Sequence, residues 1–379
     1  MSTMNLTLLT DFYELTMMQG YFKTQNTEKV VFDAFYRKNP CDGGYAIAAG
    51  LDQVIDYIKS LRFSKEDIAY LRSLNTFDED FLNYLADFRF SGDIYAIPEG
   101  TVVFPREPLV KVVAPIMEAQ LVETAILTII NHQSLIATKA SRVVCAAKGD
   151  GIMEFGLRRA QGPDSGVYGA RAAVIGGCKG TSNVLTGKLF DVPVLGTHAH
   201  SWIMSFPDEY TAFRKYAELY PSACILLVDT YDPLRSGVPD AIRAFNEVLK
   251  PMGITKCGIR LDSGDMAYLS RKAREMLDDA GWTDCKISVS NSLDEYLIQD
   301  LLLQGAQIDM FGVGERMITA RSEPVFGGVY KLVAVKLPDG TYQPKMKCSD
   351  SASKAIIPGK KMPWRLYDEN GQAQCDLIA

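Results

Sequence analysis

The stretch Ile259-Arg260-Leu261-Asp262-Ser263-Gly264-Asp265 decides the fold of this chain. It is a short apolar run that ends in a tight polar turn, and a helical pattern over residues 266–280 follows it. A strand, a polar loop and a helix in that order are typical of one βα unit of a parallel sheet.

The same pattern recurs throughout residues 152–317. The strand-then-loop segments are 152–159, 176–183, 192–200, 225–230, 259–265, 287–291 and 310–316. Helix-like segments separate most of them, and each strand ends in groups suited to binding anions. A closed parallel α/β barrel would bring these strand ends to one rim, where such enzymes place their active sites.

The two ends of the chain follow a different pattern. Residues 1–116 mix short helices and strands, and a Pro-Asp-Gly turn at 338–340 between two apolar runs is typical of an antiparallel hairpin. We expect the hairpin to pack on the N-terminal layer, so that residues 1–116 and 329–379 form one discontinuous α/β domain beside a barrel domain of residues 117–328. The polar residues 349–363 are expected to form a surface loop.

Composition narrows the functional class. The 379 residues suit two domains, and an apolar share of 47% can fill a substantial core. A net charge of -6 and a pI near 5.3 argue against a nucleic-acid protein. No window reaches the roughly 20 apolar residues of a membrane span, and the N-terminus lacks a secretory pattern, so we expect a cytoplasmic protein. The eight cysteines form no Cys-x-x-Cys pair, which disfavours a zinc site or a disulfide framework.

Two early segments suit anionic ligands. Phe155-Gly156-Leu157-Arg158-Arg159 places two guanidiniums at a strand end, and arginine forks onto carboxylate or phosphate oxygens bidentately. The Gly-rich run 176–183 enters a helix and could cradle a phosphate with backbone amides, although it lacks P-loop spacing. A surface ion pair is the structural alternative for the arginines.

Two of the three histidines lie in Gly196-Thr197-His198-Ala199-His200. Residues two apart on a strand face the same way, so one hypothesis is the metal pair of an amidohydrolase barrel. That site needs further histidines on later strands, whereas His132 lies upstream, which disfavours it. A nucleophilic or phosphate-accepting histidine and a hydrogen-bonded core histidine both stay open.

The later strand ends carry carboxylates and glycines. Arg260, Asp262 and Asp265 place one cation and two carboxylates around a tight turn, where carboxylates could hold Mg²⁺ or ribose hydroxyls. Helix capping by Ser263 or Asp265 is the structural alternative. Gly312-Val313-Gly314 lacks the third glycine of a dinucleotide fingerprint, yet the amides that follow could bind a phosphate.

Together these motifs resemble those of nicotinate phosphoribosyltransferases, over nearly the whole chain. The segments that carry the resemblance are Thr10–Met17, Phe155–Gly162, Gly180–Asn183, Gly196–His200, Leu261–Asp265 and Tyr330–Val333. The resemblance implies an irregular parallel α/β barrel with a discontinuous N-terminal α/β sandwich domain, completed by the C-terminal hairpin. It also implies a homodimer whose active sites include residues from both subunits.

The implied activity is that of an ATP-hydrolysing ligase in NAD salvage. Such enzymes couple nicotinate to phosphoribosyl pyrophosphate and release nicotinate mononucleotide and pyrophosphate, with Mg²⁺ and ATP. By this resemblance His200 would be the histidine that ATP phosphorylates, while Arg260 and Asp262 would handle ribose and pyrophosphate as catalytic residues. The metal ligands are left open.

The resemblance also assigns substrate-binding residues. Tyr13 from the neighbouring subunit and Phe155 would sandwich the pyridine ring, and Arg158 would face the substrate's carboxylate or phosphate. The 5′-phosphate would be held by Gly312 and Gly314.

Thr181 and Ser182 would also bind substrate, and Ser182 distinguishes close relatives. Nicotinamide phosphoribosyltransferases carry aspartate at this position, which accepts a hydrogen bond from an amide but repels a carboxylate. Ser182 therefore favours nicotinate over the nicotinamide-using alternative. A second alternative, a catalytically silent barrel with a binding or structural role, has no need of His200 and two arginines.

Overall fold

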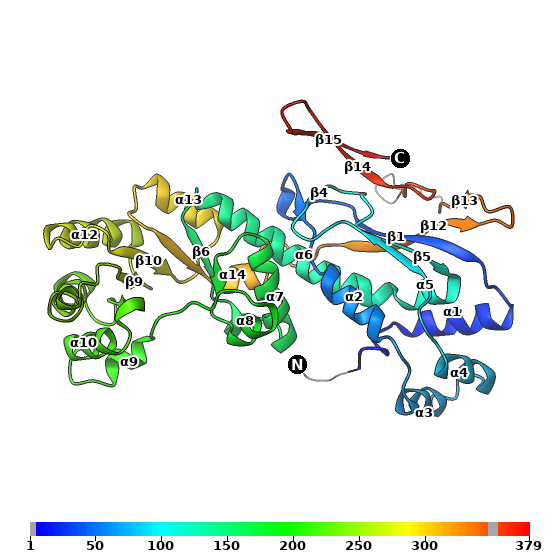
Figure 1. Cartoon of the computed structure of the whole chain (residues 1–379), viewed down its shortest axis with the longest axis horizontal. Coiled ribbons are helices and arrows are strands. Elements are labelled where there is room, and N and C mark those ends of the chain that lie inside the picture. Colours follow the sequence, from blue (N-terminus) through cyan, green and yellow to red (C-terminus); the bar gives the residue numbers. More distant parts are fainter. Residues whose placement is uncertain (1–4, 348–354) are drawn as a thin grey trace. The chain divides into compact units, whose positions relative to one another are not determined.

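The chain forms two compact units (Figure 1). This computed structural model describes residues 5–347 and 355–379. Unit 1 comprises Met1–Leu135 with Val325–Ala379, and unit 2 comprises Ile136–Pro324. Unit 1 is built on an antiparallel sheet and unit 2 on a parallel one.

The sheet of unit 1 has five strands in the order β13-β12-β1-β5-β3. Its strands are β1 (Lys29–Tyr36), β3 (Asp93–Ala96), β5 (Val110–Pro115), β12 (Gly328–Lys336) and β13 (Tyr342–Pro344). The hairpin predicted from the 338–340 turn is present as β12 and β13, and β12 pairs with β1 along most of its length. The β12–β13 hairpin, which follows unit 2 in the sequence, therefore extends a sheet whose first strand is in the N-terminal part of the chain.

Unit 1 also contains helices, and the last of them continues into unit 2 after Leu135. They are α1 (Phe12–Lys23), α2 (Leu51–Ser60), α3 (Lys65–Ser73), α4 (Glu79–Ala86), α5 (Ile116–Leu121) and α6 (Glu123–Ala146). Ser64 and Asp67 form a reciprocal capping box at the start of α3, which explains where that helix begins. Short strand pairs, β2 (Ala46–Ile47) with β4 (Val102–Val103) and β14 (Pro363–Tyr367) with β15 (Ala373–Ile378), complete the unit.

A buried charge cluster ties the C-terminal segment to this sheet. The Asp33 carboxylate on β1 accepts a hydrogen bond from Lys111 at 2.9 Å and another from Lys361. All three side chains are almost fully buried, and burial lowers the pKa of Lys361. Of the predicted surface loop at 349–363, residues 349–354 lie outside the described part, and 355–362 carry no helix or strand.

Unit 2 holds six parallel strands in the order β7-β6-β11-β10-β9-β8. They are β6 (Gly151–Glu154), β7 (Gly180–Thr181), β8 (Ile225–Leu227), β9 (Gly258–Leu261), β10 (Lys286–Ser290) and β11 (Met310–Val313). Backbone pairing runs from β7 to β8 and does not close the sheet among the described residues. The intervening chain reaches both edges, since Val194 bridges to Thr181 of β7 and His198 bonds to Leu227 of β8.

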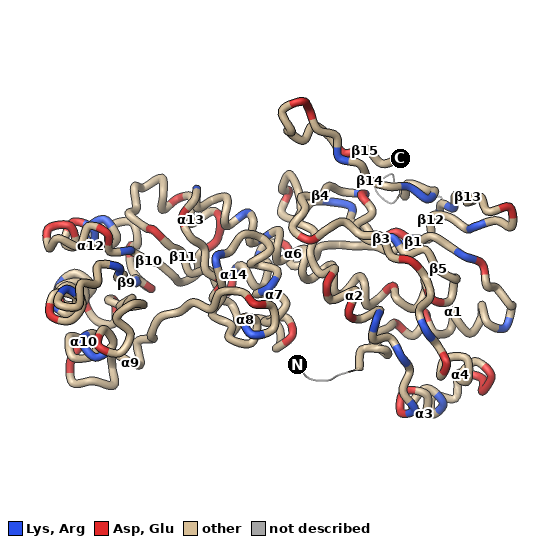
Figure 2. Tube along the Cα trace, in the orientation of Figure 1, with Lys and Arg blue, Asp and Glu red and all other residues tan. Residues whose placement is uncertain are grey.

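Helices separate these strands as the sequence pattern predicts. They are α7 (Pro163–Ile175), α8 (Val184–Phe190), α9 (His200–Met204), α10 (Glu209–Leu219), α11 (Val238–Ala244), α12 (Met266–Asp279), α13 (Glu295–Leu303) and α14 (Glu315–Ile318). Figure 2 shows acidic and basic residues interspersed along α10 and α12, where Arg214–Glu218 and Arg274–Asp278 form pairs four residues apart. Among the described residues, no helix is long and apolar enough to span a bilayer.

Close helix packing explains one glycine of the Gly-rich run 176–183. A Cβ placed on Gly176 would lie 2.4 Å from the carbonyl oxygen of Ala137 and 2.8 Å from Cβ of Ala140, both on α6. Its φ of -72° is open to any residue, so the requirement at this position is steric. Gly176 therefore lets the end of α7 approach α6.

We expect Gly176→Ala to destabilise the protein by about 1–3 kcal/mol, because the added methyl group overpacks this contact. Chemical denaturation followed by circular dichroism measures the change. Gly196→Ala is the matched control, since nothing lies within 4 Å of a Cβ at that position. If Gly176→Ala and Gly196→Ala were equally stable, α7 could move away from α6 at no cost and the close contact at Gly176 would not be required.

Candidate active site

The candidate site lies at the carboxyl edge of the parallel sheet, where the ends of neighbouring strands meet. Arg260 is on β9 and Asp262 directly follows that strand, while Ser290 ends β10 and Gly312 lies on β11. Ser290 and Gly312 are far in the sequence from Arg260 and Asp262. Parallel pairing of β9, β10 and β11 brings them together.

Arg260 and Asp262 form the centre of a hydrogen-bond network. The Arg260 guanidinium donates to the Thr197 hydroxyl at 2.5 Å through Nη1 and approaches Asp262 Oδ1 at 3.4 Å through Nη2. The Ser290 hydroxyl donates to the same Asp262 oxygen. The Arg260 guanidinium is mostly buried, whereas the Asp262 carboxylate is about one-third exposed and still reaches solvent.

His200 stands beside this network. It begins α9, and its Nε2 lies 3.8 Å from Asp262 Oδ2. Its Nδ1 lies 3.1 Å from the Thr230 hydroxyl, and 39% of its side chain is exposed. A histidine held between a carboxylate and a hydroxyl, yet open to solvent, has the arrangement of an oriented nucleophile.

His198 has a different role. It is buried, its Nε2 accepts a hydrogen bond from the Leu227 backbone N–H at 3.2 Å, and its ring packs edge-on against Tyr216. Burial, with smaller effects from Arg260 and His200, lowers the pKa of His198 to about 4. His198 is thus the hydrogen-bonded core histidine, and the paired-metal hypothesis for the two histidines is wrong.

Asp229 supports the turn that carries Asp262. Its Oδ2 accepts from the Asp262 backbone N–H at 2.9 Å and from the Ser263 hydroxyl at 2.5 Å. Its Oδ1 is buried and has no hydrogen-bond partner. Asp265 caps α12 by accepting from the Tyr268 N–H, as the capping alternative predicted.

Phe155 lies against Gly312 of β11 and against Gly314, which follows that strand. A Cβ on Gly312 would lie 2.6 Å from the Phe155 ring, and one on Gly314 would lie 3.0 Å from the Phe155 carbonyl oxygen. The Phe155 N–H also donates to the Val313 carbonyl at 2.8 Å. Gly312 therefore makes room for the Phe155 ring and Gly314 for the Phe155 backbone, and the phosphate-binding role of the two glycines stays a prediction.

The two arginines of the 155–159 segment lie in a short 3₁₀ turn and are both exposed. Arg159 Nε lies 3.7 Å from a Glu315 oxygen at the start of α14. At this exposure such a pair is worth no more than about 1 kcal/mol. Arg158 keeps the exposure that a ligand-binding guanidinium needs.

Thr181 and Ser182 differ in exposure. Thr181 is fully buried; its hydroxyl donates to Glu154 at 2.5 Å and accepts from the Asn183 N–H at 2.9 Å. Ser182 is half-buried, and its N–H donates to the Glu154 carbonyl at 3.0 Å. Of the two, Ser182 has the side chain that a substrate could reach directly.

Tyr13 belongs to unit 1, whereas the other predicted site residues belong to unit 2. Its side chain is 45% exposed on α1. Partial burial, followed by the neighbouring Glu123 and Glu14 charges, raises the pKa of the Tyr13 phenol. It is therefore neutral at physiological pH and presents an open aromatic face.

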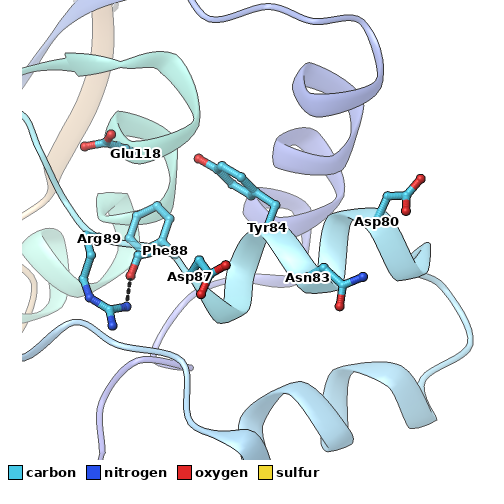
Figure 3. Close-up of a pocket in the computed structure, with 7 residues that line it drawn as sticks. All are labelled: Asp80, Asn83, Tyr84, Asp87, Phe88, Arg89 and Glu118. Carbon is cyan, nitrogen blue, oxygen red and sulfur yellow. Dashed lines mark hydrogen bonds between the residues drawn. The ribbon is translucent and has the colours of Figure 1, made fainter.

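A separate hollow of about 540 Å³ lies in unit 1 (Figure 3). Its lining residues are Asp80, Asn83, Tyr84, Asp87, Phe88, Arg89 and Glu118. The Arg89 guanidinium donates to the Phe88 carbonyl, as the dashed line in Figure 3 shows. None of the predicted site residues lines this hollow.

Sequence reasoning missed several supporting residues. Thr197, Thr230 and Ser290 contact Arg260, His200 and Asp262 respectively, and Glu154 contacts Thr181. Their position in the sequence was the available signal. Each of these four residues lies within two or three residues of a strand end or of a residue already predicted to belong to the site. Hydroxyl residues are too common in loops for that signal to stand out.

The fold and site define a parallel α/β protein in which Arg260, Asp262 and His200 lie close together at the carboxyl edge of the sheet. Comparison with known proteins gives the family. The N-terminal domain of nicotinate phosphoribosyltransferase (NAPRTase) matches residues 8–131, and the NAPRTase family matches residues 151–372. The chain belongs to the nicotinate phosphoribosyltransferase family.

Individual relatives agree with this. The chain is 47% identical to the nicotinate phosphoribosyltransferase of Bacillus subtilis, over 99% of this chain and 76% of that protein. The crystal structure of human nicotinic acid phosphoribosyltransferase is similar with a TM-score of 0.83 and 31% identity, over 97% of this chain and 81% of that one. The crystal structure of a nicotinate-nucleotide pyrophosphorylase from Pyrococcus furiosus is similar with a TM-score of 0.77 and 25% identity, over 99% of this chain and 83% of that one.

The low pKa of His198 predicts a pH-dependent stability. The unfolded histidine binds a proton below about pH 6.5, whereas the folded one does so only near pH 4, so stability is full above pH 6.5 and falls as the pH drops toward 4. Between pH 7 and pH 5 this contribution should fall by about 2 kcal/mol. Urea unfolding at the two pH values measures it.

His198→Gln is the comparison variant, because glutamine can still accept the Leu227 N–H but does not titrate. The stability loss on acidification should be smaller in this variant by about the same 2 kcal/mol. An identical loss in both proteins would mean that His198 is protonated in the fold.

Proposed function

We propose that this chain is an ATP-coupled nicotinate phosphoribosyltransferase that makes nicotinate mononucleotide and pyrophosphate in NAD salvage. The observation that carries the proposal is the convergence of Arg260, Asp262 and His200 at one sheet edge. The names of its relatives support it, since those of Bacillus subtilis and Mycobacterium tuberculosis are called nicotinate phosphoribosyltransferases. The nicotinate, phosphoribosyl pyrophosphate and ATP of this reaction are its substrates.

The chemistry suits the geometry. The pyridine nitrogen of nicotinate forms a bond to C1 of the ribose while the bond from C1 to pyrophosphate breaks, and the leaving group carries the electron pair away. Positive charge develops on the ribose ring and negative charge on pyrophosphate. Asp262 stabilises the first, and Arg260 the second, with dipoles and charges already in place before the reaction.

His200 supplies the ATP coupling in this proposal. An imidazole nitrogen takes the γ-phosphoryl group while ADP leaves, and hydrolysis later releases inorganic phosphate. A phosphoryl group on His200 adds charge beside Asp262 and the substrate phosphates, which changes their affinity between steps. Thr230 and Asp262 orient the ring on its two sides.

Mg²⁺ fits the site as a partner of the substrate phosphates. Among the described residues, no cluster of three histidine, cysteine or acidic side chains is arranged as a metal cage. Mg²⁺ typically binds one or two carboxylates and completes its shell with substrate phosphates and water. Asp262 Oδ2 and the unpartnered Asp229 Oδ1 are the donors that this chain offers, and the ion would neutralise pyrophosphate charge.

The proposal extends to architecture. We propose that the β6–β11 sheet is an irregular barrel whose gap between β7 and β8 is filled by the 194–198 segment. The barrel domain is residues 117–328, and the discontinuous sandwich domain is residues 1–116 with 329–379. In a cytoplasmic homodimer, Tyr13 of one subunit would lie opposite Phe155 of the other around the pyridine ring, while Arg158 would face the substrate's carboxylate or phosphate.

Labelling with γ-³²P ATP tests the role of His200. We expect acid-labile label on the wild-type protein and none on His200→Ala, which should keep a weak transferase activity that ATP no longer stimulates. His198→Gln should still take label, because His198 faces the core. Full ATP stimulation of His200→Ala would refute the assignment, and absence of any mononucleotide product from the wild type would favour the silent-barrel alternative.

Ser182→Asp tests the choice of substrate. A carboxylate at this half-buried position should repel nicotinate and accept a hydrogen bond from nicotinamide. We expect the ratio of kcat/KM for nicotinate over nicotinamide to fall at least 10-fold, or about 1.4 kcal/mol. Ser182→Asn, of similar size and neutral, is the control. A wild type that prefers nicotinamide would establish the alternative substrate.

A further inference from the structure

Glu154 is a fully buried carboxylate at the end of β6, and its side chain is 0% exposed. Its Oε1 accepts from the Gly156 backbone N–H and its Oε2 from the Thr181 hydroxyl at 2.5 Å. Its backbone carbonyl accepts from the Ser182 N–H at 3.0 Å. One residue thus contacts both segments that the proposed function assigns to the pyridine substrate.

The direction of these hydrogen bonds is fixed. The Thr181 oxygen accepts from the Asn183 N–H at 2.9 Å, so its own proton is free to be donated to Glu154. Gly156 offers a backbone N–H, which can only donate. An ionised carboxylate accepts from both donors at once, and no other side chain of this size does so.

The burial of Glu154 is costly. Desolvation raises its pKa, and the hydrogen bonds from Thr181 and Gly156 only partly oppose this effect. These two partners are neutral, and a charge buried among neutral partners costs more free energy than an apolar side chain of similar volume. Stability of the fold therefore gives no reason for a carboxylate here, whereas positioning of the two segments does.

The packing around Glu154 leaves its two partners little freedom. A Cβ on Gly156 would lie 2.7 Å from Glu154 Oε1 and 2.5 Å from Cβ of Ile318, so the chain is held tightly at this turn. The neighbouring Phe155 is held against Gly312 on β11. On the other side, Asn183 caps α8 directly after Ser182, which fixes the direction in which that segment leaves the sheet.

We propose that Glu154 is a positioning residue for the pyridine substrate, which holds the Phe155 segment and the Thr181–Ser182 segment in one fixed arrangement. The inference rests on the proposed function. Glu154 does not contact the substrate; it acts through the ring of Phe155 and the side chain of Ser182. The affinity for nicotinate and its selection over nicotinamide both depend on this spacing.

Glu154→Gln is the decisive variant, because it keeps the volume but replaces one acceptor with an NH₂ donor that faces Gly156 or Thr181. We expect KM for nicotinate to rise about 10-fold or more, since a small misplacement of binding groups has effects of this size. KM for phosphoribosyl pyrophosphate should change less than about twofold, and the preference for nicotinate over nicotinamide should weaken. Thr181→Val should have a similar effect, which Thr181→Ser should avoid.

Glu295→Gln is the matched control. Glu295 is also a buried acid of unit 2, but it pairs with Lys139 and Arg142. The Glu295→Gln substitution should lower the stability of the protein without changing KM for nicotinate. A variant that only loses folded enzyme loses kcat at constant KM, so a purely structural role of Glu154 would produce that pattern and overturn the proposal.

Amide hydrogen exchange separates this inference from the proposed function. In Glu154→Gln the Gly156 and Asn183 amides should exchange at least 10-fold faster than in the wild type, and in Glu295→Gln they should not. Unchanged exchange overturns the positioning role whatever the activity. A wild type that makes no nicotinate mononucleotide refutes the proposed function and with it the substrate part of this inference, while the exchange result still decides whether Glu154 holds the two segments.

Discussion

The parallel register of β9 and β10 is the constraint on which the site depends. Arg260 lies opposite Ser288 and Leu261 opposite Val289, so Ser290 comes level with Asp262 at the strand ends. The Ser290 hydroxyl and the Arg260 guanidinium can therefore meet on one Asp262 oxygen. A slip of one residue would turn these side chains to opposite faces of the sheet, and the network would be lost.

Much of this arrangement could be predicted from the sequence, for a physical reason. Apolar residues recur at different spacings in strands and in helices, so the sequence pattern predicts the order of βα units in residues 152–317. The carboxyl ends of parallel strands must share an edge, and this brings Asp262 after β9 beside Ser290 of β10. His200 reaches Asp262 from the start of α9. The hairpin of β12 and β13 followed from its turn residues.

The rest depended on contacts that no local pattern encodes. His198 and His200 are two residues apart, but α9 begins at His200. The expectation that residues two apart on a strand face the same way therefore does not apply, and His198 turns to the core. The composition around Gly176 and Gly312 predicted phosphate binding, and no local pattern indicated that a Cβ at Gly176 would meet α6 or that one at Gly312 would meet the Phe155 ring.

The buried acids of unit 2 show why stability and function impose different demands on one sheet. Glu154 ends β6 and Asp229 follows β8, and the carboxylate of each accepts hydrogen bonds from one backbone N–H and one hydroxyl of neighbouring segments. Apolar residues there would cost less to bury, but they could not hold a loop by two hydrogen bonds at once. In the proposed site these segments carry the groups that face the substrate. The hydrogen bonds of Glu154 and Asp229 would then hold those groups in place before the reaction, so that dipoles need not reorient during it.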